Sequence, residues 1–176
     1  NDPMPMSVEI RGRRGRLMAF DAYADDEADS ALCLIASDFS NEREEVETLT
    51  NSRINEIVSH MENFIEECCE GNISDYCDDS DQAIILAKEF KKKIGKSMLE
   101  SEILRFKFVI LSNKILSKQV KNVQKDDFME RPVDLNVWTL ERFFQTFETN
   151  SSEIIEFDTA DFDCDGIQYL KADIGE

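Results

Sequence analysis

The sequence predicts an α/β fold, a sandwich of helices packed against a mixed sheet, and three observations support this prediction. Segments 54–68 and 83–94 place apolar residues at steps of three and four, as one face of an amphipathic helix does. Segments 17–23 and 31–37 are typical of two strands joined as a hairpin. Residues 105–147 then alternate strand and helix, the pattern of a right-handed parallel crossover.

Helix-capping residues set the boundaries in the first half of the chain. A polar turn over 25–30 separates the two strands of the hairpin. Residues 50–52 can cap the first helix, which should stop near Gly71. Residues 78–81 can cap the second helix, with a continuation through Gly95 to about residue 102 also open.

The second half should contain two strand–helix pairs. The first pairs a strand over 105–111, which enters the sheet interior, with a short helix over 115–123. The second pairs a strand over 133–138, with Trp138 in the core, with a helix capped by Thr139. That helix should bury four apolar side chains, those of Leu140, Phe143, Phe144 and Phe147. Segments 153–157 and 167–170 can form short edge strands.

Length and composition indicate one domain. The chain has 176 residues, of which 41% are apolar, enough for a substantial core. We expect a lead-in over residues 1–16, with a truncated start and no signal peptide, and a single α/β domain over 17–176. The sequence has no apolar run long enough to span a membrane, and its five cysteines follow no disulfide framework. Both features predict a cytoplasmic protein with reduced thiols.

The net charge of −18 argues against a general nucleic-acid binder and against an anionic membrane surface. Residues 82–131 nevertheless carry twelve basic and six acidic residues. This basic segment can neutralise the acidic helix beside it. Alternatively, it can form a face that contacts nucleic acid through five lysines, Lys91, Lys92, Lys114, Lys118 and Lys121.

The hairpin supplies part of a metal-dependent nuclease site. Such a site needs an acid on one strand, and an acid and a lysine one residue apart on the next. Asp21 and Asp38 can serve as the acids, but the second strand has no lysine, so Lys107 would have to substitute for it. The catalytic set is therefore incomplete, and a divalent metal is expected only under this nuclease hypothesis. A calcium loop over 161–166 is disfavoured, because Ala172 stands where a bidentate glutamate is needed.

Several segments, taken together in order and spacing, resemble the N-terminal region of the abortive infection phage resistance (AIPR) proteins. They are residues 16–23 (RLMAFDAY), 32–39 (LCLIASDF), 47–50 (ETLT), 108–117 (FVILSNKILS), 137–143 (VWTLERF), 154–157 (IIEF) and 166–172 (GIQYLKA). The resemblance implies a bacterial, cytoplasmic protein of phage defence, in which this domain precedes a longer C-terminal region. It also favours a restriction-endonuclease-like sandwich by fold analogy, although no catalytic residue carries over.

Three functions are therefore open. The first is a non-catalytic module that positions or regulates a C-terminal effector through contacts with the rest of its own chain or with a defence partner. The second is a divergent nuclease using Asp21, Asp38 and Lys107. The third is a nucleic-acid contact module using the five lysines of the basic segment.

Overall fold

The computed structural model describes residues 2–41, 46–71, 73–78, 81–95, 98–118, 120 and 125–151. The chain forms two compact units, Asn1–Phe143 and Phe144–Glu176. The first unit holds the sheet and both long helices. In the second unit, the described residues are 144–151, which continue the helix that begins at Leu140.

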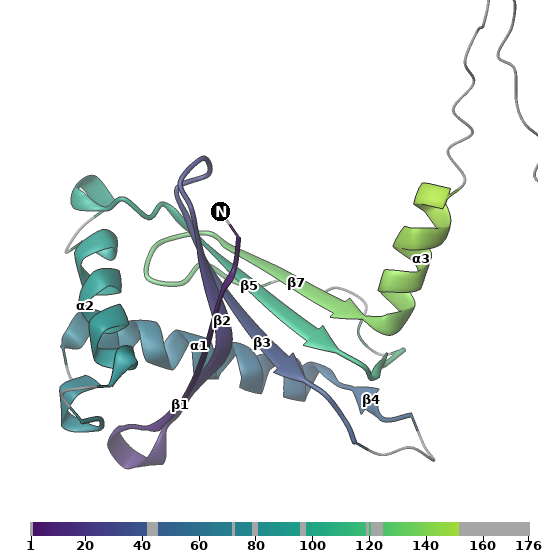
Figure 1. Ribbon diagram of the computed structural model, residues 1–176, viewed down its shortest axis with the longest axis horizontal. Coiled ribbons are helices and arrows are strands. Elements are labelled where there is room, and N and C mark those ends of the chain that lie inside the picture. The colour runs from purple at the N-terminus through teal and green to yellow at the C-terminus, as the bar shows by residue number, and fades with distance from the viewer. Residues whose placement is uncertain are drawn as a thin grey trace, which may run out of the picture. The chain divides into compact units, whose positions relative to one another are not determined.

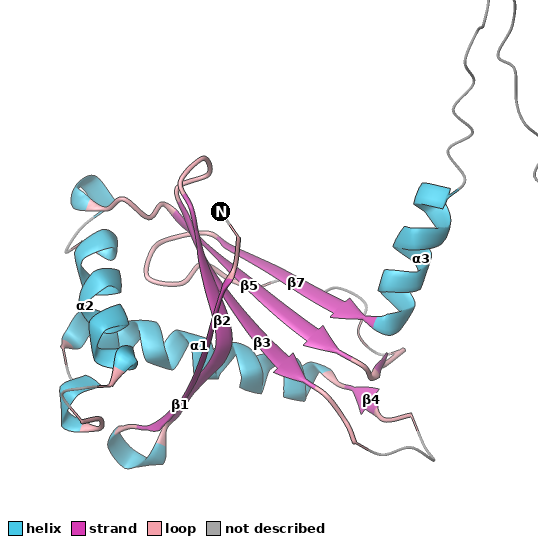
Figure 2. Ribbon diagram, in the orientation of Figure 1, coloured by secondary structure: helices cyan, strands magenta, loops and turns pink. Residues whose placement is uncertain are grey.

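A five-stranded mixed sheet forms the centre of the first unit, and the α/β prediction is confirmed. Its strand order is β1-β2-β3-β5-β7, where these strands are Met4–Arg11, Leu17–Asp26, Ala31–Asp38, Arg105–Ser112 and Val133–Thr139. The first three strands form an antiparallel meander, whereas β3, β5 and β7 run parallel (Figures 1 and 2). Strands β4 (Thr48–Leu49) and β6 (Ile115–Leu116) make a separate parallel pair.

Two helices cover one face of the sheet. Helix α1 (Asn51–Glu70) runs across it, and α2 (Gln82–Ile94) packs beside α1 (Figure 1). Both begin at predicted caps, because the Thr50 side chain accepts a hydrogen bond from Arg53 N and Asp81 accepts one from Ala83 N. Edge-to-face contacts of Phe64 with Phe20 and with Phe90 tie the two helices to β2. The hydrophobic core therefore lies between the sheet and this helical layer.

Helix α2 does not continue to residue 102. It ends at Ile94, because Gly95 has a φ of +66°, which breaks the helical path and which residues with a side chain rarely adopt. A Cβ atom at Gly95 would also lie 3.0 Å from the Glu100 carbonyl oxygen. The chain therefore turns at Gly95 and enters β5 at Arg105.

The helix predicted over 115–123 is wrong at its start. Ile115 and Leu116 form β6, with Ile115 N donating to Glu47 O and Ser117 N donating to Leu49 O, at 2.9 and 3.0 Å. A short apolar run does not distinguish a strand from a helix, and here pairing with a distant segment decides the outcome. Residues 119 and 121–124 lie outside the described residues.

The N-terminal segment and the last helix also differ from expectation. The sequence predicted no element in residues 1–16, yet they contain β1, an edge strand of the sheet. Helix α3 (Leu140–Ser151) forms where predicted, but its apolar side chains are not buried, and Phe144 and Phe147 are 65% and 70% exposed. Periodicity identifies an apolar face but not the surface that covers it. The expected strands at 153–157 and 167–170, and the acidic loop at 161–166, lie outside the described residues.

Candidate functional site

A cluster of charged side chains lies at the carboxyl ends of β3 and β5, where open α/β sheets commonly bind ligands. Its centre is Asp38, the last residue of β3, whose register partner on β5 is Ser112. Asp38 is only 6% exposed, and Arg53 contacts its Oδ1 through Nε and Nη2 at 3.1 and 2.9 Å. Because Thr50 caps α1 at Arg53 N, Arg53 lies in the first turn of α1, within reach of this strand end.

Lys114 binds the other side of Asp38. Its Nζ lies 3.0 Å from Asp38 Oδ2 and 2.9 Å from Glu47 Oε2, so one ammonium group joins two carboxylates. Main-chain contacts fix this position, because Lys114 N donates to Ser112 Oγ and Ser112 Oγ donates to Asp38 O. Lys114 is therefore held by a hydrogen bond from its backbone N–H group and by two ion pairs of its side-chain ammonium group.

The loop that follows β3 completes the cluster. Ser40 N donates to Asn113 Oδ1 and Asn113 Nδ2 donates to Ser40 O, both at 2.8 Å, while Ser40 Oγ donates to Glu47 Oε1 at 2.7 Å. These bonds tie the segment after β3 to the turn after β5. The cluster thus connects two stretches of the chain, 38–53 and 112–114.

The ion pairs determine the protonation states of the cluster. Burial raises the pKa of Asp38, but the pairs with Lys114 and Arg53 outweigh it, so the net pKa is below its usual range. The hydrogen bond from Ser40 and the pair with Lys114 lower the pKa of Glu47. The pair with Glu47 raises the pKa of Lys114. All three groups are therefore charged at neutral pH.

Asp21, the other tentative catalytic acid, has different partners. It is exposed on β2, and its Oδ2 accepts hydrogen bonds from Ser37 N and Ser37 Oγ, both at 2.6 Å. Ser37 and Asp38 are consecutive residues of β3, so their side chains point to opposite faces of the sheet. Asp21 is therefore bonded to the residue whose side chain points away from Asp38.

Lys107 lies near the other end of the sheet. Its register partner on β3 is Cys33, five residues before Asp38, which is about 16 Å along a strand. Its Nζ contacts Asp26 Oδ2 at 2.8 Å and Asp29 Oδ2 at 2.6 Å, at the turn of the β2–β3 hairpin. These two contacts raise the pKa of Lys107 well above its usual range. The structure does not bring Lys107 to Asp21 or Asp38.

These residues do not fit a divalent metal. Among the described residues, no group of three or more His, Cys, Asp or Glu side chains is placed to hold one. Asp38 is already neutralised by two cations, and Asp21 contributes a single carboxylate. Metal-assisted hydrolysis needs open coordination positions together with an oriented water molecule. We therefore derive no metal-dependent step from this site.

The described lysines of the predicted basic face differ in exposure and in their partners. Lys91 and Lys92 are exposed in the last turn of α2, and Lys118 is exposed after β6. Lys114 is inside the charged cluster with 14% of its side chain exposed. Lys121 lies outside the described residues.

One comparison with known proteins gives a match. A family model described as the abortive infection phage resistance protein N-terminal domain matches residues 1–145. The chain belongs to this family. Searches of curated proteins and of solved structures found no significant match.

The AIPR N-terminal domain contains site residues that the sequence analysis did not identify. It missed Arg53, Glu47 and Ser112 as partners of Asp38 and Lys114, and Asn113 as the partner of Ser40. The one local signal was the Thr50 cap, which places Arg53 in the first turn of α1. The other contacts join segments more than sixty residues apart, and no local pattern predicts them.

The remaining nucleophilic and titratable candidates that the structure describes in this AIPR domain have pKa values shifted by burial. Cys33, Cys68, Cys69 and Cys77 are free thiols, and burial raises the pKa of each of them. Burial also lowers the pKa of His60. Cys164 lies outside the described residues. Among the described helices, none is long and apolar enough to cross a membrane.

Proposed function

We propose that this AIPR N-terminal domain is a non-catalytic module that positions or regulates an effector region of a phage-defence protein through protein contacts. The observation that carries the proposal is the double neutralisation of Asp38 by Arg53 and Lys114. A carboxylate held by two cations is a structural group, because it has no free charge to attract a metal ion or activate a water molecule.

The separation of Asp21, Asp38 and Lys107 also supports a non-catalytic role. Each has its own partners: Ser37 for Asp21, Arg53 and Lys114 for Asp38, and two hairpin carboxylates for Lys107. General acid–base and metal chemistry both require these groups within hydrogen-bonding or ligand distance of one reacting centre. The β2–β3 hairpin therefore serves as scaffold in this proposal.

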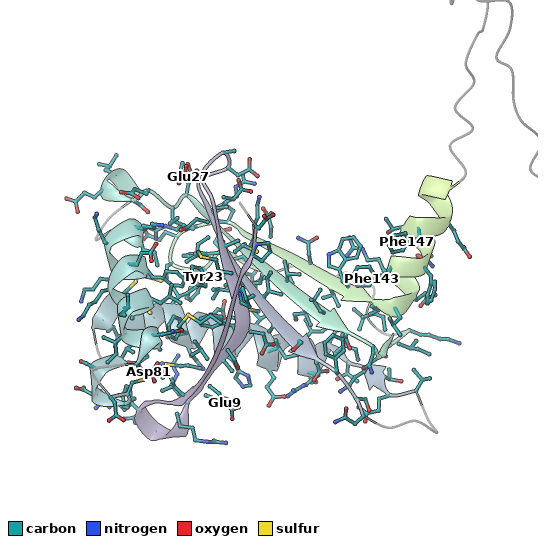
Figure 3. All side chains as sticks on the ribbon, in the orientation of Figure 1. Glu9, Tyr23, Glu27, Asp81, Phe143 and Phe147 are labelled. Atoms are coloured by element: carbon teal, nitrogen blue, oxygen red, sulfur yellow. The ribbon has the colours of Figure 1, made fainter. Side chains whose placement is uncertain are left out.

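Exposed aromatic residues support the protein-contact part of the proposal. Phe144 and Phe147 on α3 are mostly exposed, and Leu140 is 49% exposed on the same helix. The Trp138 ring of β7 contacts the Phe143 ring at a tilt of 33°, with centroids 5.0 Å apart, and the Arg142 guanidinium lies 4.4 Å from the centroid of the Trp138 ring (Figure 3 labels Phe143 and Phe147). Large exposed apolar side chains that gather on one element are typical of interaction surfaces.

A nuclease assay tests the first part. Single- and double-stranded DNA and RNA, incubated with this chain and Mg²⁺ or Mn²⁺, should remain intact. Asp21→Ala and Asp38→Asn are the matched variants. Cleavage that survives purification and disappears in Asp21→Ala would overturn the proposal.

A phage-protection assay in a complete AIPR-type protein tests the second part. Asp21→Asn should leave protection unchanged, because Asp21 has no catalytic role in this proposal. Phe144→Glu and Phe147→Glu should abolish protection without unfolding the domain, which circular dichroism checks. Loss of protection in Asp21→Asn, with Phe147→Glu still protective, contradicts the proposal.

A further inference from the structure

Strand β7 is the last strand of the five-stranded sheet that the described residues form. Among the described residues, no strand pairs with β7 on the side away from β5. Phe106 of β5 is in register with Val133, and Phe106 N donates to Pro132 O. In a parallel ladder this directs the C=O group of Pro132, and the N–H and C=O groups of Asp134 and Asn136, toward β5. Val133, Leu135 and Val137 therefore direct theirs outward.

The two edges of the sheet differ in how they resist further pairing. At the opposite edge, β1 contains Pro5 and a register shift between Pro5 and Val8, two features that discourage another strand from adding. Strand β7 has no proline, and its register with β5 is unbroken over seven consecutive pairs. This open edge therefore has none of the protection found at β1.

A hollow borders part of β7. This hollow of about 600 Å³ is lined by Val133, Asp134, Leu135 and Asn136 of β7, together with side chains of Lys107, Lys125 and Asp126. At the far end of the strand, Arg142 Nη1 donates to Val137 O at 2.8 Å. The outward backbone groups left open are therefore the N–H and C=O groups of Val133 and Leu135 and the N–H of Val137, with Leu135 at the centre.

This edge is complementary to itself when two copies run antiparallel. A twofold axis at Leu135 sets Leu135 opposite its own copy and Val133 opposite Val137 of the other copy. Leu135 and its copy can exchange two hydrogen bonds, and each Val137 N–H can donate to Val133 O of the other copy, whereas Val137 O stays bonded to Arg142. On the other face, Asp134 lies opposite Asn136 of the other copy, and an amide can donate to the carboxylate. No like charges face each other.

We infer that two copies of this chain associate by antiparallel pairing of their β7 edges about a twofold axis at Leu135. The two five-stranded sheets then form one continuous sheet. The row Val133, Leu135 and Val137 continues across the axis on the face that the helices cover. Such an interface is isologous and closes at two copies. The inference stands apart from the proposed function, because assembly is measured by mass and not by phage protection.

The charge of the chain gives the association an unusual salt dependence. Each copy carries a formal charge of −18, so two copies repel each other over long range. Salt screens this repulsion, with a Debye length of about 10 Å at 0.1 M. The dimer fraction, measured by sedimentation velocity over a range of concentrations, should therefore rise between 0.05 and 0.5 M NaCl. If the chain is a monomer at every concentration and salt level, the inference is overturned. This holds also if the β7 edge pairs with a strand of a different protein.

Two pairs of variants test the edge itself. Leu135→Pro removes an outward N–H group and spares every bond to β5, whereas Leu135→Ala removes a similar amount of side chain and keeps the N–H. The dissociation constant should rise about tenfold more in Leu135→Pro than in Leu135→Ala. Asn136→Asp creates two like-charge pairs across the axis and should raise the constant about tenfold. The swap Asp134→Asn with Asn136→Asp should restore dimerisation, and failure to restore it contradicts this register.

Cysteine cross-linking tests the register directly. Asp134 and Asn136 of the other copy form a non-hydrogen-bonded pair, with Cα atoms about 4.5 Å apart, within disulfide range. A mixture of Asp134→Cys and Asn136→Cys should form an intermolecular disulfide on mild oxidation. With either variant alone, the yield of cross-linked dimer should not exceed that given by the native thiols. In that case the two introduced cysteines lie diagonally across the axis and not directly opposite each other. Equal cross-linking in all three samples overturns the proposed pairing.

Discussion

Asp38 at the end of β3 and Arg53 in the first turn of α1 form a two-contact ion pair, in which Nε and Nη2 of the guanidinium bind one carboxylate oxygen. The pair joins the sheet to the helical layer at the carboxyl ends of the parallel strands. The Asp38 side chain is buried and the Arg53 side chain is 41% exposed, so the ion pair lies at the boundary between the core and the solvent. Lys114 on the other side completes the neutralisation.

Arg53→Met should therefore destabilise the domain. It leaves a buried carboxylate with Lys114 as its one remaining cation, and we expect a loss of about 1–3 kcal/mol in the free energy of unfolding. Urea denaturation followed by circular dichroism measures this loss. Glu56→Gln is the matched control, because it removes the exposed partner of the same arginine and should cost much less. Equal losses in the two variants contradict a structural role for Asp38.

The same carboxylate predicts an acid-sensitive contribution to stability. The pKa of Asp38 is lower in the folded state than the value of about 3.9 expected in the unfolded chain. Its stabilisation is therefore complete above about pH 4 and is lost as the pH falls through the folded-state pKa. The free energy of unfolding should drop less between pH 6 and pH 3 in Asp38→Asn than in the wild type. An identical drop in both shows that Asp38 is not ion-paired in solution.

Arg131 is a second structural arginine and should not tolerate lysine. It is 4% exposed, and its guanidinium donates to the carbonyl oxygens of Ile94, Ile103 and Met129 at 2.8–3.0 Å. A lysine cannot reach three carbonyls in this planar arrangement. We expect Arg131→Lys to cost about 2–3 kcal/mol in thermal or urea unfolding. Arg105→Lys, at an exposed pair with Asp134, is the control and should be nearly neutral.

Core and surface phenylalanines should respond differently to truncation. Phe64 is fully buried between Phe20 and Phe90, so Phe64→Ala should cost about 3–5 kcal/mol. Phe147→Ala, at an exposed position on α3, should change stability by less than about 0.5 kcal/mol. Denaturant unfolding of both variants checks this. A large loss at Phe147 would show that the apolar face of α3 is covered in solution.

Thiol labelling should report folding rather than catalysis. Burial raises the pKa of Cys68 far above its usual range, and its thiol is 2% exposed in the core. Iodoacetamide at pH 7.5 should leave Cys68 unmodified in the native protein and modify it in urea, as mass spectrometry of the peptides can show. Rapid labelling of native Cys68 contradicts its place in the core. The less buried Cys77 is the internal comparison.

The elements with a strong internal pattern were predictable. Apolar spacing and capping residues located α1 and α2 with their starting points, and alternation located β2, β3, β5 and β7. The collinear segments also led to the AIPR family, which the match over residues 1–145 confirms. Strand β1 was missed, because an exposed edge strand with one fully buried side chain has little alternation to detect.

By itself, the sequence determined which segments become helices and strands, since that choice depends on spacing within ten or twenty residues. It also placed Asp38 at a strand end and a basic segment within an acidic chain. The tertiary structure alone decided the partners: Arg53 and Lys114 for Asp38, Ser37 for Asp21, and two hairpin acids for Lys107. Ion pairs form between charged groups that the fold brings close together, and the positions of charged residues in the sequence do not give the distances between them in space.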